Sequence, residues 1–346
     1  MAKNIAFCCD GTWDDPNDNS NVCQMYSALE QVEGAQVAMY DSGVGTSGTP
    51  IEKLLGGAVG AGLFQKIQDG YSAIAGVYQP GDQIFIFGFS RGAYTARSLA
   101  GMIAICGLPT NFQAGSNCVQ MAFSAYRNQA NRTALLASLN AAYKMDTTTT
   151  IQLLGVWDTV GSLGIPGIFG DTDMMQYGFL STTLHPNVLN AVQALAIDEQ
   201  RQQFQPSLWS NEPLPTQSIT QAWFSGVHCD VGGGYPPDAG GATPSNITLL
   251  WMANYARVFG LQFNPGAISS ALIAADSVSA LHDSRTGAYR IFPPHIRTIA
   301  PDAILGSSVG VRCATPACKY APVNLTLTGG QVTASYNGVN VADIVI

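Results

Sequence analysis

Charged side chains are scarce in this sequence. Of its 346 residues, 15 are Lys or Arg and 23 are Asp or Glu, so that charged residues make up 11%, about half of the usual share. With 47% hydrophobic residues, the sequence predicts a sparsely charged, partly apolar surface, which suits an apolar substrate or partner. The net charge of −8 and the scattered basic residues leave no basic stripe for phosphates, which excludes nucleic acid as a partner.

Long hydrophobic runs are also absent. No window reaches the length of a membrane span without a charge or a break at Gly or Pro. The first residues, MAKNIAFCCDGTW, lack the apolar core of a signal peptide. We therefore expect a chain that is cytoplasmic as synthesised, without a Sec-type export signal. α/β enzymes with cap insertions commonly reach this length as one domain, so we expect a single domain over residues 1–346.

The cysteines do not follow a metal-binding pattern. None of the eight forms a C-x-x-C pair, and most are interpreted as small buried hydrophobic residues. Cys313 and Cys318 have a spacing that could close a small loop in an oxidising compartment. We expect neither a metal nor a cofactor.

Nucleotide-binding patterns are missing or out of context. The phosphate-binding motif G-x-x-x-x-G-K-[ST] does not occur. Residues 43–48 match G-x-G-x-x-G, the rival fingerprint of a dinucleotide-binding fold, but Pro50 follows, so no helix opens at the third glycine. A loop beside the functional site is the favoured interpretation of this segment.

Residues 83–107 carry the most informative pattern in the chain. An apolar strand over residues 83–87 leads into the turn GFSRG and then into a helix with a hydrophobic face. This order is the nucleophile elbow of α/β hydrolases, G-x-S-x-G. The serine occupies a strained position at the tip of the strand, where neighbouring side chains would collide. We therefore predict Ser90 as the nucleophile and Gly88 and Gly92 as the elbow glycines.

Two segments are candidates for an oxyanion hole. The helix that starts at Arg91 directs its N–H groups and its positive end toward the space above Ser90, where an anionic intermediate would form. The loop after the first strand supplies the second donor in this fold, which indicates a backbone N–H of Gly11 or Thr12. We expect the side chain of Arg91 to pair with an acid such as Asp10.

Only four histidines can serve as the general base. His228 follows the predicted strand 217–224 and precedes glycines that would let a loop bend over the site. It is our candidate. His282, in the segment LHDS, is its main rival, whereas His185 and His295 lie in irregular segments where a structural role is favoured.

Asp158 is the candidate acid. It ends the predicted strand 151–157 and lies between the serine and the histidine, the chain order Ser, Asp, His of this fold. The rival carboxylates are Asp171, Asp173 and Asp198. For Asp230, structural hydrogen bonding is favoured over cation binding, because no cluster of further oxygen ligands is evident.

The predicted fold is a three-layer α/β hydrolase with a mainly parallel sheet, helices on both faces and an insertion cap. Cap or lid insertions are expected at about residues 108–148 and 162–190. Strands are predicted over residues 4–9, 36–40, 83–87, 151–157, 217–224 and 331–336. Helices are predicted over residues 22–32, 63–78, 118–143, about 186–199 and 248–259.

An ordered series of motifs resembles the α/β-hydrolase catalytic domain of the first family of type VI secretion lipase effectors, including its GFSRGA motif. The series is CCDGTW (8–13), SGVGT (42–46), GDQIFIFGFSRGAYTARSLAG (81–101), GVWDTVGSLG (155–164), ALAIDEQRQQFQPSLW (194–209), WFSGVHCDVGGGY (223–235) and LHDS (281–284). The resemblance covers residues 5–325. It implies a Ser-Asp-His hydrolase and, for effector members, phospholipase A activity toward bacterial membrane glycerophospholipids.

The family roles fall on Ser90, Asp158 and His228. The chain departs from the family pattern at Gln193, where many members have a histidine. It also lacks the large membrane-binding region that effectors often append, and residues 326–346 have no recognised counterpart. Export by a contact-dependent secretion system follows from the resemblance only.

The sequence thus predicts a serine hydrolase that cleaves carboxylic esters of lipids, phospholipase A-like, through an acyl-enzyme and without a cofactor. A small-ester carboxylesterase is the first alternative. The second is a non-catalytic binding or delivery module that retains the fold. The candidate partners are a lipid or ester substrate, a membrane surface in transient contact, and an inhibitory or secretion-apparatus protein.

Overall fold

A parallel sheet forms the middle of the protein. The computed structural model describes residues 2–11, 19–43, 58–160, 183–274, 276–325, 327–328 and 331–332. Within them the strand order is β2-β1-β3-β6-β7-β8-β9, and all neighbouring pairs are parallel. The strands are β1 (Asn4–Cys9), β2 (Gln36–Asp41), β3 (Gln83–Phe89), β6 (Ile151–Trp157), β7 (Asn190–Ala196), β8 (Ser218–Phe224) and β9 (Ile304–Leu305).

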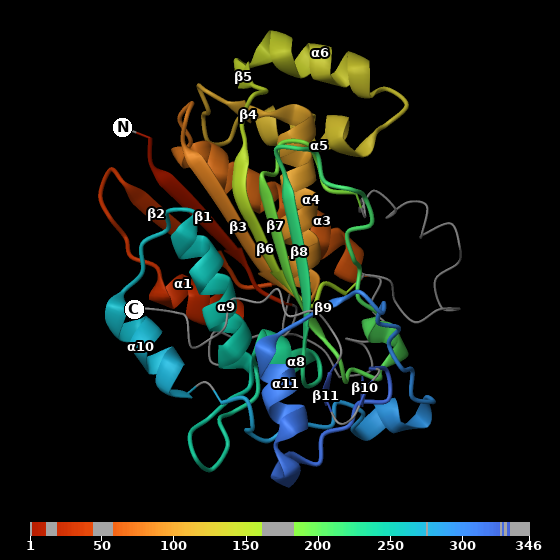
Figure 1. Ribbon diagram of the computed structural model, residues 1–346. Helices are drawn as coiled ribbons and strands as arrows, with labels where there is room; N and C mark the ends of the chain where they lie inside the picture. The colour runs from red at the N-terminus through yellow and green to blue at the C-terminus, as the bar shows by residue number, and fades with distance from the viewer. Residues whose placement is uncertain are drawn as a thin grey trace.

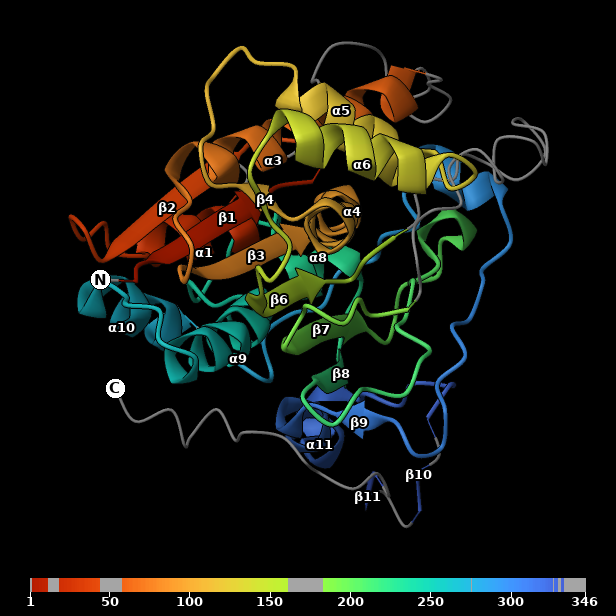
Figure 2. The same cartoon turned by 90° about the horizontal axis from the view of Figure 1, so that it is seen from above.

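Helices cover both faces of this sheet (Figures 1 and 2). One face carries α3 (Ala58–Val77) and α4 (Arg91–Cys106), and the other carries α1 (Asn21–Ala28), α9 (Ser245–Val258) and α10 (Pro265–Ala274). α11 (Ser307–Ala314) packs beside β9 at one edge. The predicted three-layer α/β fold with a mainly parallel sheet is confirmed.

The central strands are apolar on both faces because both faces are covered. Alternate residues of a strand point to opposite sides, so Phe7 and Ile86 join the core beneath α3 and α4. Phe85 and Phe87 instead join the core beneath α1 and α9. Continuous hydrophobic runs such as IFIFGF follow from this double burial.

The first predicted insertion, residues 108–148, contains α5 (Cys118–Arg127), α6 (Arg132–Ala142) and the short antiparallel pair β4 (Leu108–Pro109) and β5 (Met145–Asp146). α5 packs against α3 and α4. In Figure 1, α6, β4 and β5 lie at the upper end of the sheet, opposite α8 (His228–Gly232) at the lower end. Of the second insertion, residues 162–182 lie outside the described residues. A lid role for either insertion stays a prediction.

One helix prediction was wrong. The segment expected to be helical over residues 186–199 contains β7, which pairs with β6 and β8 in the sheet. Its residues NAVQALA are almost entirely buried, and a short apolar run buried on both sides has no periodicity that separates strand from helix. Residues 118–143 form two helices rather than one. Of the last predicted strand, Gln331–Val332 is described and pairs as β11 with β10 (Leu327–Thr328).

All eight cysteines are free, so the loop closure between Cys313 and Cys318 is not formed. Burial raises the pKa of Cys106 to about 12 and that of Cys118 to about 11, so these thiols are poor nucleophiles. In the part of the chain that the structure describes, no helix has the length and apolarity of a membrane span. No group of metal-binding side chains is found among the same residues.

Truncating the core of the central strand should destabilise the protein strongly. Phe85 is fully buried in β3, and a Phe85→Ala change is expected to cost about 3–5 kcal/mol, because it removes apolar contacts and leaves a cavity. Thermal or urea unfolding measures the loss. Val258→Ala is the matched control, because Val258 is 69% exposed. Equal stability of the two variants would contradict this packing.

Candidate active site

Ser90 lies in a tight turn between β3 and α4. Its backbone has φ 57° and ψ −120°, a conformation that non-glycine residues rarely adopt and that characterises a nucleophile elbow. A Cβ atom at Gly88 would lie 2.5 Å from the carbonyl oxygen of Gly92, and one at Gly92 would lie 2.2 Å from that of Cys9. The two glycines therefore permit the close backbone approach that the sequence predicted.

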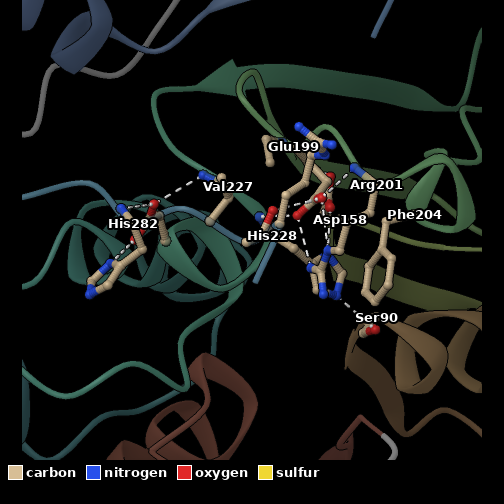
Figure 3. Close-up of polar contacts among 12 residues, drawn as sticks. Ser90, Asp158, Glu199, Arg201, Phe204, Val227, His228 and His282 are labelled. Carbon is tan, nitrogen blue, oxygen red and sulfur yellow. Dashed lines mark hydrogen bonds and ion pairs between the residues drawn. The ribbon is translucent and has the colours of Figure 1, made fainter. Parts of the chain in front are cut away.

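The structure brings Ser90, His228 and Asp158 together (Figure 3). The Nε2 atom of His228 lies 2.8 Å from the Oγ atom of Ser90, and its Nδ1 atom lies 2.6 Å from the Oδ2 atom of Asp158. Ser90 is 7% exposed, His228 3% and Asp158 0%. These residues follow β3, β8 and β6, whose carboxyl ends meet at one edge of the sheet, and they are separated by 138 and 70 positions in the chain.

His228 is held by a helix and by aromatic rings. It begins α8, so a short helix follows β8 where the sequence suggested a loop that bends over the site. Its backbone N–H donates to Oε2 of Glu199 at 3.2 Å. The ring centroids of Phe89 and Phe204 lie 4.6 and 5.0 Å from that of the imidazole.

Asp158 has a complete set of hydrogen-bond donors. Its Oδ1 accepts from the backbone N–H of Ala196 at 3.0 Å and from Nη1 of Arg297 at 2.7 Å. Its Oδ2 accepts from Nη2 of Arg297 at 2.9 Å and faces His228. Burial alone would raise the pKa of Asp158, but the Arg297 guanidinium and the hydrogen bonds outweigh it and hold that pKa well below the usual range. The carboxyl group is therefore ionised.

Sequence reasoning missed Arg297. It is 1% exposed and also donates to the backbone carbonyls of Ala196 at 2.7 Å and Phe204 at 2.5 Å. The residue lies in an irregular segment between the short 3-10 helix Gly287–Ile291 and β9. No pattern around a lone arginine in such a segment marks it as a partner of a residue 139 positions away.

A second ion pair flanks His228. The Nε and Nη2 atoms of Arg201 donate to the two carboxylate oxygens of Glu199, each at 2.9 Å, and Ser284 donates to Oε1 at 2.9 Å. The Arg201 guanidinium lies 3.5 Å above the Phe204 ring. Glu199, Arg201 and Ser284 fall within the motifs ALAIDEQRQQFQPSLW and LHDS, but their types and spacing alone indicated no role.

His282, the main rival as a base, lies in a separate pair. Its Nδ1 atom is 2.6 Å from Oδ1 of Asp230, and its ring stacks on Tyr235 at 3.9 Å. The Oδ2 atom of Asp230 accepts from the backbone N–H groups of Val227 and His282. Asp230 thus connects the start of α8 to the segment around His282.

The other rivals that the structure describes, His185, His295 and Asp198, have recorded neighbours other than Ser90. His185 is partly buried near Gly101 in α4, and the backbone N–H of His295 donates to the carbonyl of Gln200. Asp198 accepts from the N–H of Gly226 and from the hydroxyl of Tyr320, and burial raises its pKa to about 6. Asp171 and Asp173 lie outside the described residues.

The predicted oxyanion donors have different surroundings. Arg91 is the first residue of α4, and its side chain is half-buried. The N–H of Gly11 donates to Oδ1 of Asp10 at 2.8 Å, and the Oδ2 of this carboxylate accepts from the hydroxyl of Ser20 at 2.5 Å. Thr12 lies outside the described residues. The oxyanion roles remain predictions, and Gly11 would have to exchange its partner to fulfil one.

The charges around His228 are arranged in pairs. Burial lowers the pKa of the imidazole, and the hydrogen bond and charge of Asp158 offset this only in part, so the ring is neutral at neutral pH. Burial would raise the pKa of Glu199, but Arg201 outweighs it and keeps that group ionised. A neutral imidazole beside an ionised carboxylate can accept a proton from Ser90.

The chain matches a family model described as the catalytic domain of Tle1-like phospholipase effectors of the type VI secretion system, over residues 3–255. A curated relative is an uncharacterised protein of Saccharomyces cerevisiae. It is 23% identical over 81% of this chain and 60% of its own length.

The chain is also similar to two solved structures. One is an uncharacterised protein from Pseudomonas aeruginosa, with a TM-score of 0.46 and 16% identity over 80% of this chain and 49% of its own. The other is the Tle1 effector bound to the VgrG spike of the type VI secretion system, with a TM-score of 0.40 and 19% identity over 68% of this chain and 52% of its own. The chain thus spans about half to three fifths of the length of these relatives.

A methyl group at Gly92 should disable the elbow. Because it would lie 2.2 Å from the carbonyl oxygen of Cys9, Gly92→Ala must displace Ser90 or the end of β1. We expect reaction of Ser90 with a fluorophosphonate probe to fall at least about 100-fold, since a displacement of about 1 Å costs that much. Gly76→Ala is the control, because it meets no atom closer than 4.0 Å and should stabilise α3 by about 0.5–1 kcal/mol. Full labelling of folded Gly92→Ala protein would contradict the elbow geometry.

Proposed function

Because this chain belongs to the family of Tle1-like phospholipase effector catalytic domains of the type VI secretion system, we propose that it is a serine hydrolase that cleaves ester bonds of lipids. The family membership confirms the resemblance of the motifs and supports hydrolysis of the lipase or phospholipase type. The observation that carries the finer assignment is the hydrogen-bonded chain Ser90, His228 and Asp158, with contacts of 2.8 and 2.6 Å.

In the proposed reaction, His228 takes the proton of Ser90 through Nε2 while Oγ attacks the ester carbonyl. Asp158 orients the imidazole through Nδ1 and stabilises the imidazolium that forms. Return of the proton to the leaving alcohol breaks the ester bond and leaves an acyl group on Ser90. Water, activated by the same imidazole, then releases the carboxylic acid.

The oxyanion of the tetrahedral intermediate needs donors near Ser90. We assign one of them to the backbone N–H of Arg91, which begins α4 directly after the serine and can add the positive end of the helix. The second donor is assigned to the loop that follows β1, near Gly11 or Thr12. To serve as this donor, the N–H of Gly11 would have to exchange Oδ1 of Asp10 for the oxyanion.

Two alternatives differ in substrate or in chemistry. A small-ester carboxylesterase would use the same residues, and only the substrate series separates it from a lipase. A non-catalytic binding module would have no use for a strained Ser90 within hydrogen-bond distance of a buried, acid-paired imidazole. That geometry favours the enzyme.

The partners remain proposals. We propose a glycerophospholipid or another lipid ester as substrate, presented at a membrane surface. The type VI secretion effector family supports a secretion-apparatus partner and contact-dependent export, and an inhibitory protein would fit such an effector. No nucleic acid partner is proposed, given the net charge of −8.

Loss of the nucleophile tests the mechanism. Ser90→Ala protein should lose fluorophosphonate labelling and at least about 10⁴-fold of its turnover of p-nitrophenyl esters and phosphatidyl liposomes, since no acyl-enzyme can form. Ser138→Ala, a change at an exposed position of α6, should behave as the wild type. Folded wild-type protein that is not labelled, even with detergent present, would favour the binding module. Turnover of short esters without liposome hydrolysis would favour the carboxylesterase.

The pH profile tests the assignment of the base. The protonated imidazole cannot accept the proton of Ser90, so activity rises as His228 loses its proton. Since burial lowers the pKa of this group, the acid limb of kcat/KM should have its midpoint below the ordinary histidine value of about 6.5. Hydrolysis of a short p-nitrophenyl ester, followed where nitrophenol and nitrophenolate absorb equally, measures it. A midpoint above about 7 would contradict the assignment.

A further inference from the structure

Arg297 lies behind the carboxylate that faces His228. We propose that Arg297 is a positioning residue of the hydrolase: it holds the Asp158 carboxylate in the orientation that His228 requires and balances its charge. The proposal rests on the proposed function, because it assigns a role toward the same reaction.

The geometry of the contact supports orientation rather than mere charge. Nη1 and Nη2 of Arg297 donate to the two oxygens of Asp158 at 2.7 and 2.9 Å. This two-pronged contact fixes the plane of the carboxylate, which a point charge cannot do. Rotation of the carboxylate would break both hydrogen bonds and carry Oδ2 away from Nδ1 of His228.

The guanidinium is itself anchored. It donates to the carbonyls of Ala196, at the end of β7, and of Phe204. The ring of Phe204 packs edge-on against His228 at 5.0 Å between centroids. Arg297 therefore connects the Asp158 carboxylate and the Phe204 ring, which confine the imidazole from two sides. Because Arg297 is 1% exposed, water does not compete for its hydrogen bonds.

The charges that face His228 come from three segments. Asp158 follows β6, Arg297 precedes β9, and Glu199 and Arg201 follow β7. On α8 itself, Cys229 and Asp230 are the neighbouring titratable groups, and Asp230 is paired with His282. Tyr289 lies 5.0 Å from the Arg201 guanidinium. Asp158 and Glu199 are thus each matched by one guanidinium. Without Arg297, Asp158 would be a buried charge compensated by His228 alone, which favours imidazolium in the resting enzyme.

An arginine that only held the fold together would also be buried and paired. Its loss would lower stability and the fraction of active protein, but it would not shift the acid limb of the pH profile. A positioning role predicts a lower kcat with an almost unchanged KM, because Arg297 acts through Asp158 and not on the substrate. These readouts separate the two roles.

The test compares Arg297→Gln and Arg297→Lys with wild type. Arg312→Gln is the matched control, because Arg312 is also buried and donates to the carbonyl of Ser279. Fluorophosphonate titration first gives the concentration of reactive Ser90 in each protein. Next, kcat per active site and KM are measured with a short p-nitrophenyl ester. The same assay over a range of pH gives the midpoint of the acid limb of the kcat/KM profile.

We expect Arg297→Gln to lower kcat at least about tenfold, but less than the ~10⁴-fold that follows when a triad carboxylate is replaced. KM should change by less than about twofold, and the acid limb should move up by about one pH unit, because the compensating cation is gone. Arg297→Lys should keep the acid limb near that of the wild type and restore part of kcat. Arg312→Gln should lose stability only.

Two results would overturn the proposal while leaving the proposed function intact: a folded Arg297→Gln protein with wild-type kcat and acid limb, or the same losses in Arg312→Gln. If Arg297→Gln does not fold, the test rests on Arg297→Lys. The single ammonium group of lysine cannot form the two-pronged contact, so a wild-type kcat in this variant would refute the orienting role of Arg297. Unlabelled wild-type protein would instead refute the proposed function, so the two failures are distinct.

Discussion

The site depends on one buried negative charge. Asp158 has no exposed surface, and a carboxylate in such a place is expensive unless every oxygen has a donor and the charge has a partner. The backbone N–H of Ala196, both prongs of Arg297 and the imidazole of His228 meet this requirement. The ends of β6 and β7, the helix start at His228 and the segment before β9 are thereby drawn to one point.

The scarcity of charge along the chain has a counterpart inside it. Several of the few charged side chains are buried, and those around His228 include Asp158, Glu199, Asp230 and Arg297. Each has an ionic or hydrogen-bonded partner in the structure. Part of the sparse charge thus lies in the interior around His228 and not at the surface.

Much of this arrangement was predictable from the sequence because it depends on local rules. The elbow around Ser90 needs two glycines in a short motif, and Asp158 and His228 directly follow strands. Arg297, Glu199 and Arg201 were not predictable as members of the site, since their partners are distant in sequence or lie in irregular segments. At β7 the sequence predicts a helix wrongly, because its alanines, Val192 and Leu195 are buried on both sides, which removes the alternation that marks a strand.

The close approach at Gly92 has a consequence for how such a protein can diversify. A side chain there would meet the carbonyl of Cys9, and one at Gly43 would lie 2.0 Å from the carbonyl of Gly11. The backbone ends of β1, β2 and β3 therefore interlock without intervening side chains, and this corner tolerates little variation. Substrate preference can therefore diverge only by changes elsewhere in the chain, while the interlocked corner, and the nucleophile with it, stays in place.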